Sequence, residues 1–416
     1  MQQKGILVIV NLDTRGHEFS FVKESIAKRG LRPIIMDFSM EKKPPYPGDI
    51  TCEEVADAGG MSIEDVRYNY NKGDRFKATA NQIAGGKKIA DQLFKAGKIH
   101  GALGAGGATS TLISTTIMKT LPFGFPKLMA TSMAAHPRYI DKFVGTKDFT
   151  MHHTVLDVVG LNPLLKIQLR NAIGAICGMV EMSEGWEPRE NTKPFIAITG
   201  FGFAERAVEH AITFLEQLNY QPVACHSQGV GDRAMDEMIA DGLFKGVIDF
   251  VTGGVADELF NGNCAGGPNR VVAACRAKIP QIVCPAGLDK IGYGGRPDLQ
   301  ARFGGRKMKI LDSARVEVRT SPEECQEIAR VLAAKLNEAV APTKFLYPQK
   351  GWSAISEAGM HIHDPEADAA FLKELKQHLK KEVELVEVPW NLNSKEFAKI
   401  AVELFDQMYK SAPIQG

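Results

Sequence analysis

Apolar runs alternate with amphipathic segments along the 416-residue chain. The first run, Gly5 to Leu12, is continuous and apolar, which is typical of a parallel strand buried on both faces. Phe19, Val22 and Ile26 then recur at helical spacing. Further strands are expected at residues 31–37 and 126–131, and an amphipathic helix at 76–96 leads into a short glycine-rich strand. The first half is therefore expected to alternate strand and helix.

The same alternation begins again near Pro194. Strands are expected at 195–200, 221–226, 246–252, 280–284, 344–347 and 383–388, with helices at 207–218, 234–244, 365–380 and 394–409. This order matches the first half, so we interpret the chain as a pseudo-repeat of two doubly wound α/β domains with parallel sheets. The polar stretch Ser183–Thr192 is the expected joint, which gives domains at 1–190 and 191–416.

Two long segments between these strands have a different pattern. Residues 39–60 are rich in proline and are expected to form an ordered loop. Residues 164–182 are expected to form a long helix, and polar residues at 157–163 precede it. Both segments therefore connect strands of the first half.

The stretch from His100 to Thr111 has the pattern of a phosphate-binding turn. Gly101, Gly104, Gly106 and Gly107 allow backbone N–H groups to approach an anion, and the helix that follows adds unpaired donors. Thr109 and Ser110 are expected to cap that helix, whose buried side is expected to be formed by Leu112, Ile113, Ile117 and Leu121. A tight turn that needs glycine only for packing is the alternative.

The known phosphate-loop motifs do not fit this stretch. A Walker A loop requires Lys and then Ser or Thr after its last glycine, whereas Gly107 and Ala108 follow Gly106 here. A dinucleotide fingerprint requires a third Gly or Ala where Thr109 stands, and it requires a downstream acid that is missing. Any anion site here would therefore be of another type.

Polar residues follow the strands of the first half, where open parallel sheets bind their ligands. They are Asp13, Thr14, Arg15, Gly16 and Glu18, then Gly104 to Ser110, and then Thr131 and Ser132. Asp13 and Glu18 beside a glycine turn suit Mg²⁺ with a nucleotide, and Arg15 can neutralise phosphate charge. Alternatively, Asp13 and Glu18 only cap the next helix and Arg15 pairs with one of them.

The second half offers candidate acid–base residues after its strands. Asp257 and Glu258 follow a Gly-Gly turn, Asp289 follows another strand, and His361 precedes His363 and Asp364. Neighbouring residues of a helix do not share a face, so only one of Asp257 and Glu258 is expected to act. His361, His363 and Asp364 have a spacing that can bind a metal, but Asp364 can instead cap a helix that starts at Pro365.

Composition narrows the class of protein. The 50 basic and 49 acidic residues nearly balance, so charge supports neither nucleic-acid nor membrane binding. The seven cysteines are scattered and include no Cys-x-x-Cys pair, as expected for reduced core residues of a cytoplasmic protein. The first apolar run is too short for a signal peptide or a membrane span.

Taken together, these motifs resemble the Tm-type ATP-binding domain family. The motifs that carry the resemblance are Asp13–Glu18, Leu103–Thr111, Pro126–Ala134, Asp157–Asn162, Thr252–Leu259, Pro285–Asp289 and His363–Asp368. The resemblance implies two Rossmann-like domains with a ligand cleft between them, ATP with Mg²⁺ in the first domain, and a homodimer. It also implies that a plant member acts by binding a viral replication protein.

Three functions fit these expectations. The first is an ATP-dependent enzyme whose small-molecule substrate lies near Asp257, Glu258, Asp289 and His361. The second is a regulatory or interaction module that binds ATP without turnover, which the missing Walker lysine favours. The third is carbon-bond or acyl chemistry in the second domain without phosphoryl transfer.

Overall fold

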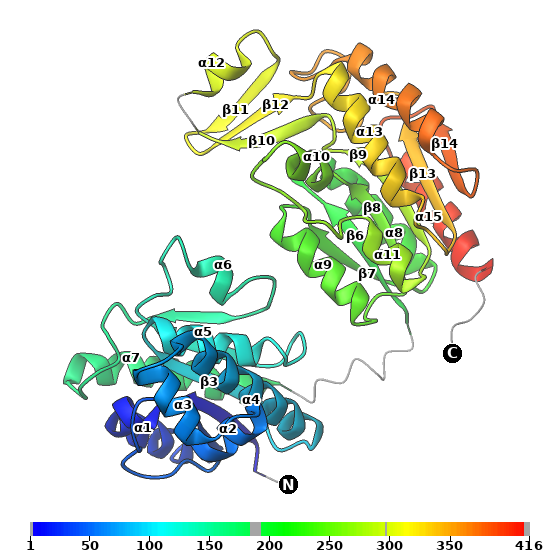
Figure 1. Ribbon diagram of the computed structural model, residues 1–416. Helices are drawn as coiled ribbons and strands as arrows, with labels where there is room; N and C mark the ends of the chain where they lie inside the picture. The colour runs from blue at the N-terminus through cyan, green and yellow to red at the C-terminus, as the bar shows by residue number, and fades with distance from the viewer. Residues whose placement is uncertain (1–2, 184–192, 296–297, 412–416) are drawn as a thin grey trace. The chain divides into compact units, whose positions relative to one another are not determined.

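The computed structural model describes residues 3–183, 193–295 and 298–411. The chain divides into two compact units, Met1–Pro188 and Arg189–Gly416 (Figure 1). Both are α/β units built on a parallel sheet, so the expected fold class is confirmed. The expected joint between them lies, apart from Ser183, outside the described residues. No described helix is long and apolar enough to cross a membrane.

The N-terminal unit contains a five-stranded parallel sheet in the order β2-β1-β3-β4-β5. Its strands are β1 (Gly5–Val10), β2 (Arg32–Asp37), β3 (Gly101–Gly106), β4 (Lys127–Thr131) and β5 (Thr150–His153). The helices are α1 (Leu12–Ala27), α2 (Cys52–Gly59), α3 (Ile63–Asn71), α4 (Arg75–Lys95), α5 (Ala108–Met118), α6 (Ile140–Phe143) and α7 (Pro163–Met182).

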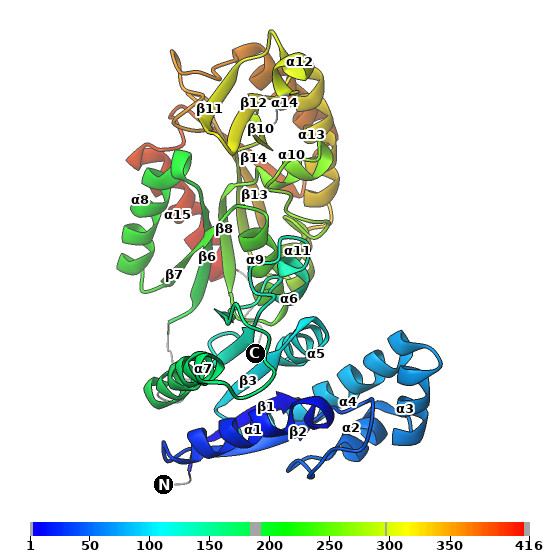
Figure 2. The same cartoon turned by 90° about the vertical axis from the view of Figure 1, so that its left-hand side faces the viewer.

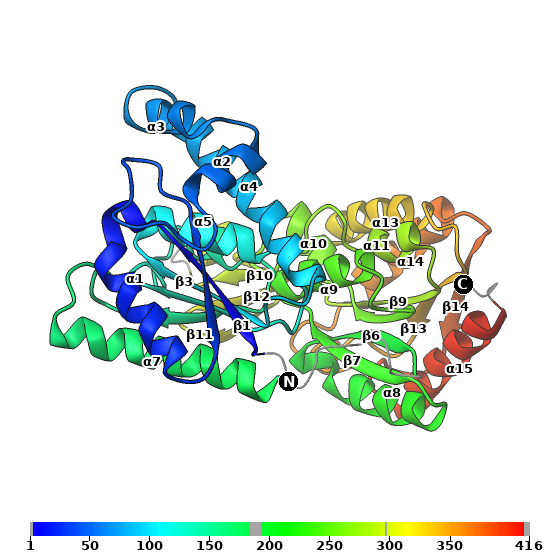
Figure 3. The same ribbon diagram turned by 90° about the horizontal axis from the view of Figure 1, so that it is seen from below.

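Alternating side chains of β1 separate the two faces of this sheet. Ile6, Val8 and Val10 pack against α1 and α7, whereas Leu7 and Ile9 pack on the side of α2, α4 and α5 (Figure 3). The central strand β1 is thus buried on both faces, as its continuous apolar sequence predicts. Because α1 and α5 lie on opposite faces, the order of successive strands reverses between β1 and β3, and such folds bind ligands at this point.

The C-terminal unit repeats this design with six parallel strands in the order β14-β13-β9-β8-β6-β7. They are β6 (Phe195–Gly200), β7 (Gln221–His226), β8 (Gly246–Val251), β9 (Gln281–Ala286), β13 (Thr343–Pro348) and β14 (Val383–Val388). Counted from its own first strand, this is the N-terminal order with one strand added. The expected pseudo-repeat is therefore present in the topology.

Helices again cover both faces of the C-terminal sheet. One face packs against α8 (Glu205–Gln217) and α15 (Lys395–Ser411). The other face packs against α9 (Val230–Ala240), α11 (Val272–Ala277), α13 (Pro322–Leu336) and α14 (Pro365–His378) (Figure 2). The carboxyl ends of these strands form one edge of the sheet. Helix α10 (Gly254–Leu259) follows β8 at this edge, and the loop after β9 begins there too.

A small antiparallel sheet, which the sequence pattern did not reveal, follows β9. It has the order β10-β12-β11, with β10 (Lys290–Gly294), β11 (Met308–Asp312) and β12 (Arg315–Arg319). Ile291 and Val318 belong to its apolar face, which packs on α12 (Leu299–Phe303). Lys290 and Glu317 alternate with these residues and share the opposite, polar face.

Several element predictions need correction. The expected loop at 39–60 contains α2, which begins at Cys52 because Thr51 and Glu54 form a capping box. The helix expected at 234–244 starts earlier, at Val230, where Asp232 accepts a hydrogen bond from the Gly229 N–H. Helices α3 and α13 were not predicted. Leu112 is 37% exposed, because the buried side of α5 is formed by Ile113 and Ile117 instead.

Candidate functional site

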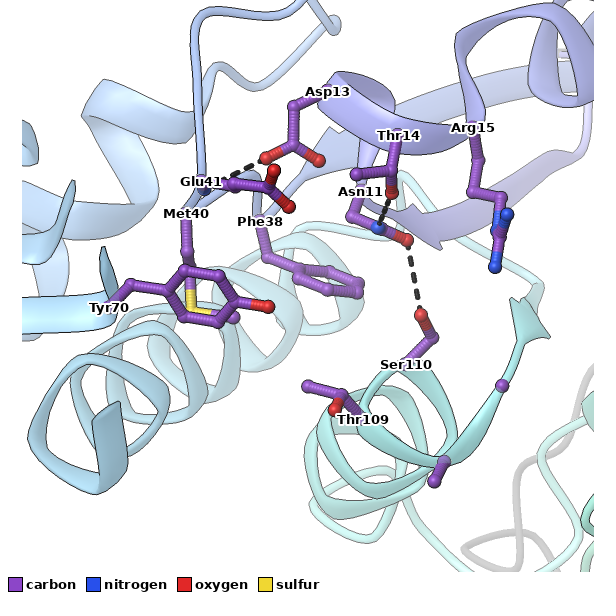
Figure 4. Close-up of a pocket in the computed structure, with 12 residues that line it drawn as sticks. Asn11, Asp13, Thr14, Arg15, Phe38, Met40, Glu41, Tyr70, Thr109 and Ser110 are labelled. Carbon is purple, nitrogen blue, oxygen red and sulfur yellow. Dashed lines mark hydrogen bonds between the residues drawn. The ribbon is translucent and has the colours of Figure 1, made fainter. Parts of the chain in front are cut away.

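A cavity of about 380 Å³ lies at the point of the N-terminal sheet where β1 and β3 lead to helices on opposite faces. Segments that follow β1, β2 and β3 supply most of its lining (Figure 4). The lining residues are Asn11, Asp13, Thr14, Arg15, Phe38, Met40, Glu41, Tyr70, Gly107, Ala108, Thr109 and Ser110. This is the position at which doubly wound sheets bind ligands.

The glycine stretch forms one wall of the cavity, but its turn starts later than expected. Strand β3 runs through Gly104 to Gly106, and α5 begins at Ala108 with Gly107 as its N-cap. No side chain caps this helix, so its first-turn N–H groups have neither an intrahelical acceptor nor a capping acceptor. Thr109 and Ser110 therefore belong to the first turn of α5 and are not its caps.

Each glycine of this stretch has a different role. A Cβ on Gly104 would lie 2.7 Å from Met129 Sδ, so this glycine allows close packing inside the sheet. Gly106 has φ +145° and a Cβ there would lie 2.6 Å from Ser110 Cβ, so the turn requires glycine. Gly107 has φ −84° and no atom of a described residue closer than 3.8 Å to its missing side chain, and it is the one of these three glycines that lines the cavity.

Hydroxyl and amide groups join the first turn of α5 to the end of β1. The Ser110 hydroxyl donates to Asn11 Oδ1 over 3.1 Å, and the Asn11 amide donates to the Thr14 hydroxyl (Figure 4). Thr131 and Ser132, also expected at the site, do not line the cavity. Thr131 is buried and accepts a hydrogen bond from the Thr111 hydroxyl over 2.8 Å, so it holds α5 against β4.

The two carboxylates expected to hold Mg²⁺ have different partners. Asp13 lines the cavity, and its Oδ2 accepts from the Glu41 N–H over 2.9 Å, which brings the loop after β2 to α1. Glu18 does not line the cavity, and its Oε1 accepts from the Gly160 N–H over 2.5 Å. Among the described residues no group of three or more metal-ligating side chains is found. Mg²⁺ bound to phosphates requires fewer protein ligands, so this metal site remains a prediction.

Arg15 is the only cationic side chain among the described residues that line the cavity. Its guanidinium pairs with Asp157 over 3.5 Å, and not with Asp13 or Glu18 as the alternative expected. A Cβ on Gly107 would lie 3.8 Å from the same Asp157 oxygen, so this ion pair lies beside the start of α5. Gly16, which was also expected at the site, instead packs against Pro45.

The opposite wall is apolar and was missed at the level of sequence. Phe38 and Met40 come from the segment after β2, and Tyr70 comes from α3. The Arg75 guanidinium lies 4.1 Å from the Tyr70 ring centroid, which supports that ring from outside the cavity. The position of Phe38 directly after a strand was the one available signal, whereas Tyr70 belongs to a helix that was not predicted.

In the C-terminal unit the four candidate acid–base residues separate into two groups. Asp257 and Asp289 are buried, and both act on the charge of Lys290. Glu258 is exposed and accepts a hydrogen bond from the Gly267 N–H over 3.0 Å, as expected for neighbours on opposite helix faces. His361 is exposed and lines none of the described cavities.

The segment from His361 to Asp364 is organised by helix capping. Asp364 is the N-cap of α14, and its Oδ1 accepts from the Ala367 N–H over 3.2 Å. The His363 ring lies 2.9 Å from the Ser356 carbonyl oxygen through Nδ1. The capping alternative is thus present, and the part of the chain that the structure describes holds no metal cluster here.

All seven cysteines lie in described residues and are free thiols. Six are buried and Cys264 is partly exposed. This agrees with their interpretation as core residues, and none belongs to a metal cluster in the described ranges.

Sequence comparisons place the chain among bacterial proteins with the same two-domain layout. Residues 4–185 match the N-terminal domain and residues 193–409 the C-terminal domain of the uncharacterised protein family UPF0261. A UPF0261 protein of Clostridium tetani is 36% identical over 98% of this chain and 100% of its own length. One of Rhizobium meliloti is 30% identical over 97% of this chain and 98% of its own length.

A plant relative confirms the resemblance that the motifs indicated. The ToMV resistance protein Tm-1(GCR237) of Solanum lycopersicum is 30% identical over 96% of this chain, which spans 55% of that protein. The two family matches together cover most of this chain, and the two bacterial relatives align over 98–100% of their own length. The chain therefore belongs to the UPF0261 family.

Proposed function

We propose that the N-terminal unit binds ATP with Mg²⁺ in the cavity between β1 and β3. The observation that carries this proposal is the uncapped N-terminus of α5, which opens into the cavity together with Arg15. Unpaired N–H groups and the helix dipole favour a phosphate group there. An anionic oxygen accepts from these donors more strongly than a neutral oxygen does.

The remaining walls suit the other parts of a nucleotide. Phe38, Met40 and Tyr70 offer an apolar surface to a base, and Asp13 and Glu41 are the carboxylates that can hold Mg²⁺ or ribose hydroxyls. Arg15 would exchange its exposed partner Asp157 for a phosphate oxygen. The volume of about 380 Å³ falls in the range of small-molecule sites.

We further propose that the protein is a cytoplasmic homodimeric enzyme that uses this nucleotide to act on a small metabolite. Support comes from Asp257 and Asp289, two buried carboxylates that follow strands of the second sheet. Buried carboxylates at that edge are costly for the fold, so they favour a chemical role. Glu258 and His361 have less support, because one is bonded to Gly267 and the other is exposed.

Calorimetric titration of Mg-ATP into the intact protein tests the nucleotide site. Gly107→Val is the informative variant, since its backbone angles accept valine and its side chain would lie at the start of α5, with Asp157 Oδ1 at 3.8 Å from Cβ as the only near atom among the described residues. We expect the affinity to fall at least about tenfold, equivalent to ~1.4 kcal/mol. Gly174→Val, in open space on α7, is the control and should bind as the wild type does. Absent binding in the wild type would refute the proposal.

A second candidate is an ATP-binding interaction module without turnover. It is favoured by the lining of the cavity, which contains no lysine among its described residues and hence no counterpart of the Walker lysine. The name of the plant relative, a virus-resistance protein, also suits a binding role. Phosphate release measured on the calorimetry sample separates the two, because only the enzyme releases phosphate with its substrate present.

A further inference from the structure

The polar face of the antiparallel sheet holds a buried ammonium group that no hydrogen bond satisfies. The Lys290 side chain is 4% exposed and its Nζ lies 3.6 Å from Glu317 Oε1, beyond hydrogen-bond length. Its other contacts are the rings of Phe201 and Phe203, at 5.1 and 5.5 Å from Nζ to the centroids. Among the described residues, Lys290 thus has three N–H donors without an acceptor.

A carboxylate with a free oxygen lies near this ammonium. Asp257 is 1% exposed, and its Oδ1 accepts from the Gly292 N–H over 2.9 Å. Its Oδ2 is buried and has no hydrogen-bond partner of normal geometry, although the Cys264 backbone also stabilises the carboxylate charge. Asp257 and Lys290 form no direct ion pair in the described structure, so each retains unused hydrogen-bonding capacity.

Gly292 leaves the space between the two groups open. A Cβ on this residue would lie 3.6 Å from both Asp257 Oδ1 and Lys290 Nζ. Gly292 is partly exposed, and Gly202, at the end of the loop after β6, is exposed with no atom near its missing side chain. The open side of Gly292 therefore faces Asp257 Oδ1 and Lys290 Nζ, so a small ligand beside this glycine can contact both atoms.

The charges of the site define the ligand it can accept. Three carboxylates, Asp257, Glu317 and Asp289, act on one ammonium, so a further anion would be repelled. The free donors of Lys290 require an acceptor oxygen, and Asp257 Oδ1, on the same open space, can accept from a proton donor beside it. A neutral molecule with a carbonyl oxygen and an adjacent acidic C–H or O–H bond meets all three conditions.

We propose that Asp257 and Lys290 form a proton-transfer site for a small neutral hydroxycarbonyl compound. Lys290 donates a hydrogen bond to the carbonyl oxygen, and Asp257 Oδ1, which faces the same open space, takes a proton from the neighbouring carbon. The C–H electron pair forms the new C=C bond, and the carbonyl π pair moves onto the oxygen, whose negative charge the ammonium stabilises. The reverse step returns the proton, so no oxidant or co-reactant is needed.

Electrostatics supports this division of roles. Burial raises the pKa of Asp257 to about 6, against the opposing effect of Lys290, which suits a base that gains and loses protons near neutral pH. Burial lowers the pKa of Lys290, but Asp257 and Glu317 raise it above its usual value, so the group stays an ammonium. A permanently charged amine stabilises an oxyanion and does not attack a carbonyl. These residues lie in the C-terminal unit alone, and the inference does not depend on nucleotide binding.

Proton NMR in D₂O tests the inference through exchange of the α-hydrogens of hydroxyacetone and dihydroxyacetone, with and without Mg-ATP. We expect the intact protein to accelerate exchange at least about tenfold over buffer, and Asp257→Asn and Lys290→Met to abolish the acceleration. Circular dichroism checks that both variants fold.

Glycine substitutions provide the matched comparison. Gly292→Ala places a methyl group in ordinary contact with Asp257 and Lys290, so it should fold and slow the exchange severalfold. Gly294→Ala lies two residues along the same strand, 3.6 Å from Asn263 Nδ2, and should exchange at the wild-type rate. No acceleration with either compound under either condition, or full activity in Asp257→Asn or Gly292→Ala, overturns the proposal. Either result leaves the nucleotide titration unaffected.

Discussion

One buried arginine connects two elements of the C-terminal unit. Arg270 is fully buried and binds Asp232 Oδ1 over 2.7 Å and Asp249 over 2.5 and 2.6 Å. The guanidinium also donates to the Val251 carbonyl over 2.7 Å, so it joins α9 to the end of β8. A buried cation is tolerated here because its donors are used by ionised or polar acceptors. The sequence offered no signal for this network, since its members lie far apart in the chain.

Asp236 lies beside this network, and its Oδ2 accepts no hydrogen bond from the described residues. We expect this carboxyl group to make the stability of the protein depend on pH. Burial raises its pKa from 3.8 to about 7, despite Arg270, so the folded state holds the proton more tightly than the unfolded state. Its contribution therefore becomes unfavourable as pH rises from about 4 to 7. Asp236→Asn should be more stable than the wild type at pH 8, by on the order of 2 kcal/mol.

Thermal unfolding at several pH values measures this difference, which should shrink as the pH falls towards 4. The exposed Asp241→Asn, just beyond the same helix, is the control and should leave the pH profile unchanged. An Asp236→Asn protein that is less stable than the wild type at pH 8 would contradict the account.

At the scale of elements, the joints between strands and helices were harder to predict than the elements themselves. Three strands, 195–200, 221–226 and 383–388, have the predicted bounds, because short segments with apolar residues between turn signals identify strands. The start of α5 was placed too late, because Thr109 and Ser110 have the chemistry of caps but lie inside the first turn, where the Ser110 hydroxyl donates to Asn11. Residue type alone does not show whether a hydroxyl residue lies at the cap or in the first turn.

The turn between β3 and α5 predicts that alanine is tolerated at Gly107 but not at the adjacent Gly106. Gly106→Ala combines a positive φ with a Cβ 2.6 Å from Ser110, so it should destabilise the N-terminal unit by about 1–3 kcal/mol. Gly107→Ala meets neither obstacle and should change stability by less than about 0.5 kcal/mol. Chemical denaturation of the two variants measures the contrast. Equal stability of the two proteins would show that the turn is not strained as described.

At the scale of the whole molecule, the two units share a strand order, apart from one added strand in the second. They differ in the polar residues that follow the strands. The sequence predicted both sheets and the residues of the β1 and β3 turns, because local patterning determines these features. It did not predict Phe38 and Tyr70 as a wall, or Lys290 beside Asp257, because tertiary packing brings these residues together. Lys290 in particular depends on an antiparallel sheet whose short strands were not recognised.

The central claim is that a nucleotide phosphate binds the first turn of α5. Hydrogen–deuterium exchange with mass spectrometry tests it directly on the intact protein, because the first-turn N–H groups of α5 lack intrahelical acceptors and should exchange rapidly without ligand. With Mg-ATP we predict slower exchange in peptides that cover residues 107–111 and 38–41, and no such slowing in the Gly107→Val protein. Unchanged exchange at residues 107–111 under saturating Mg-ATP, or protection confined to the C-terminal unit, would contradict the account.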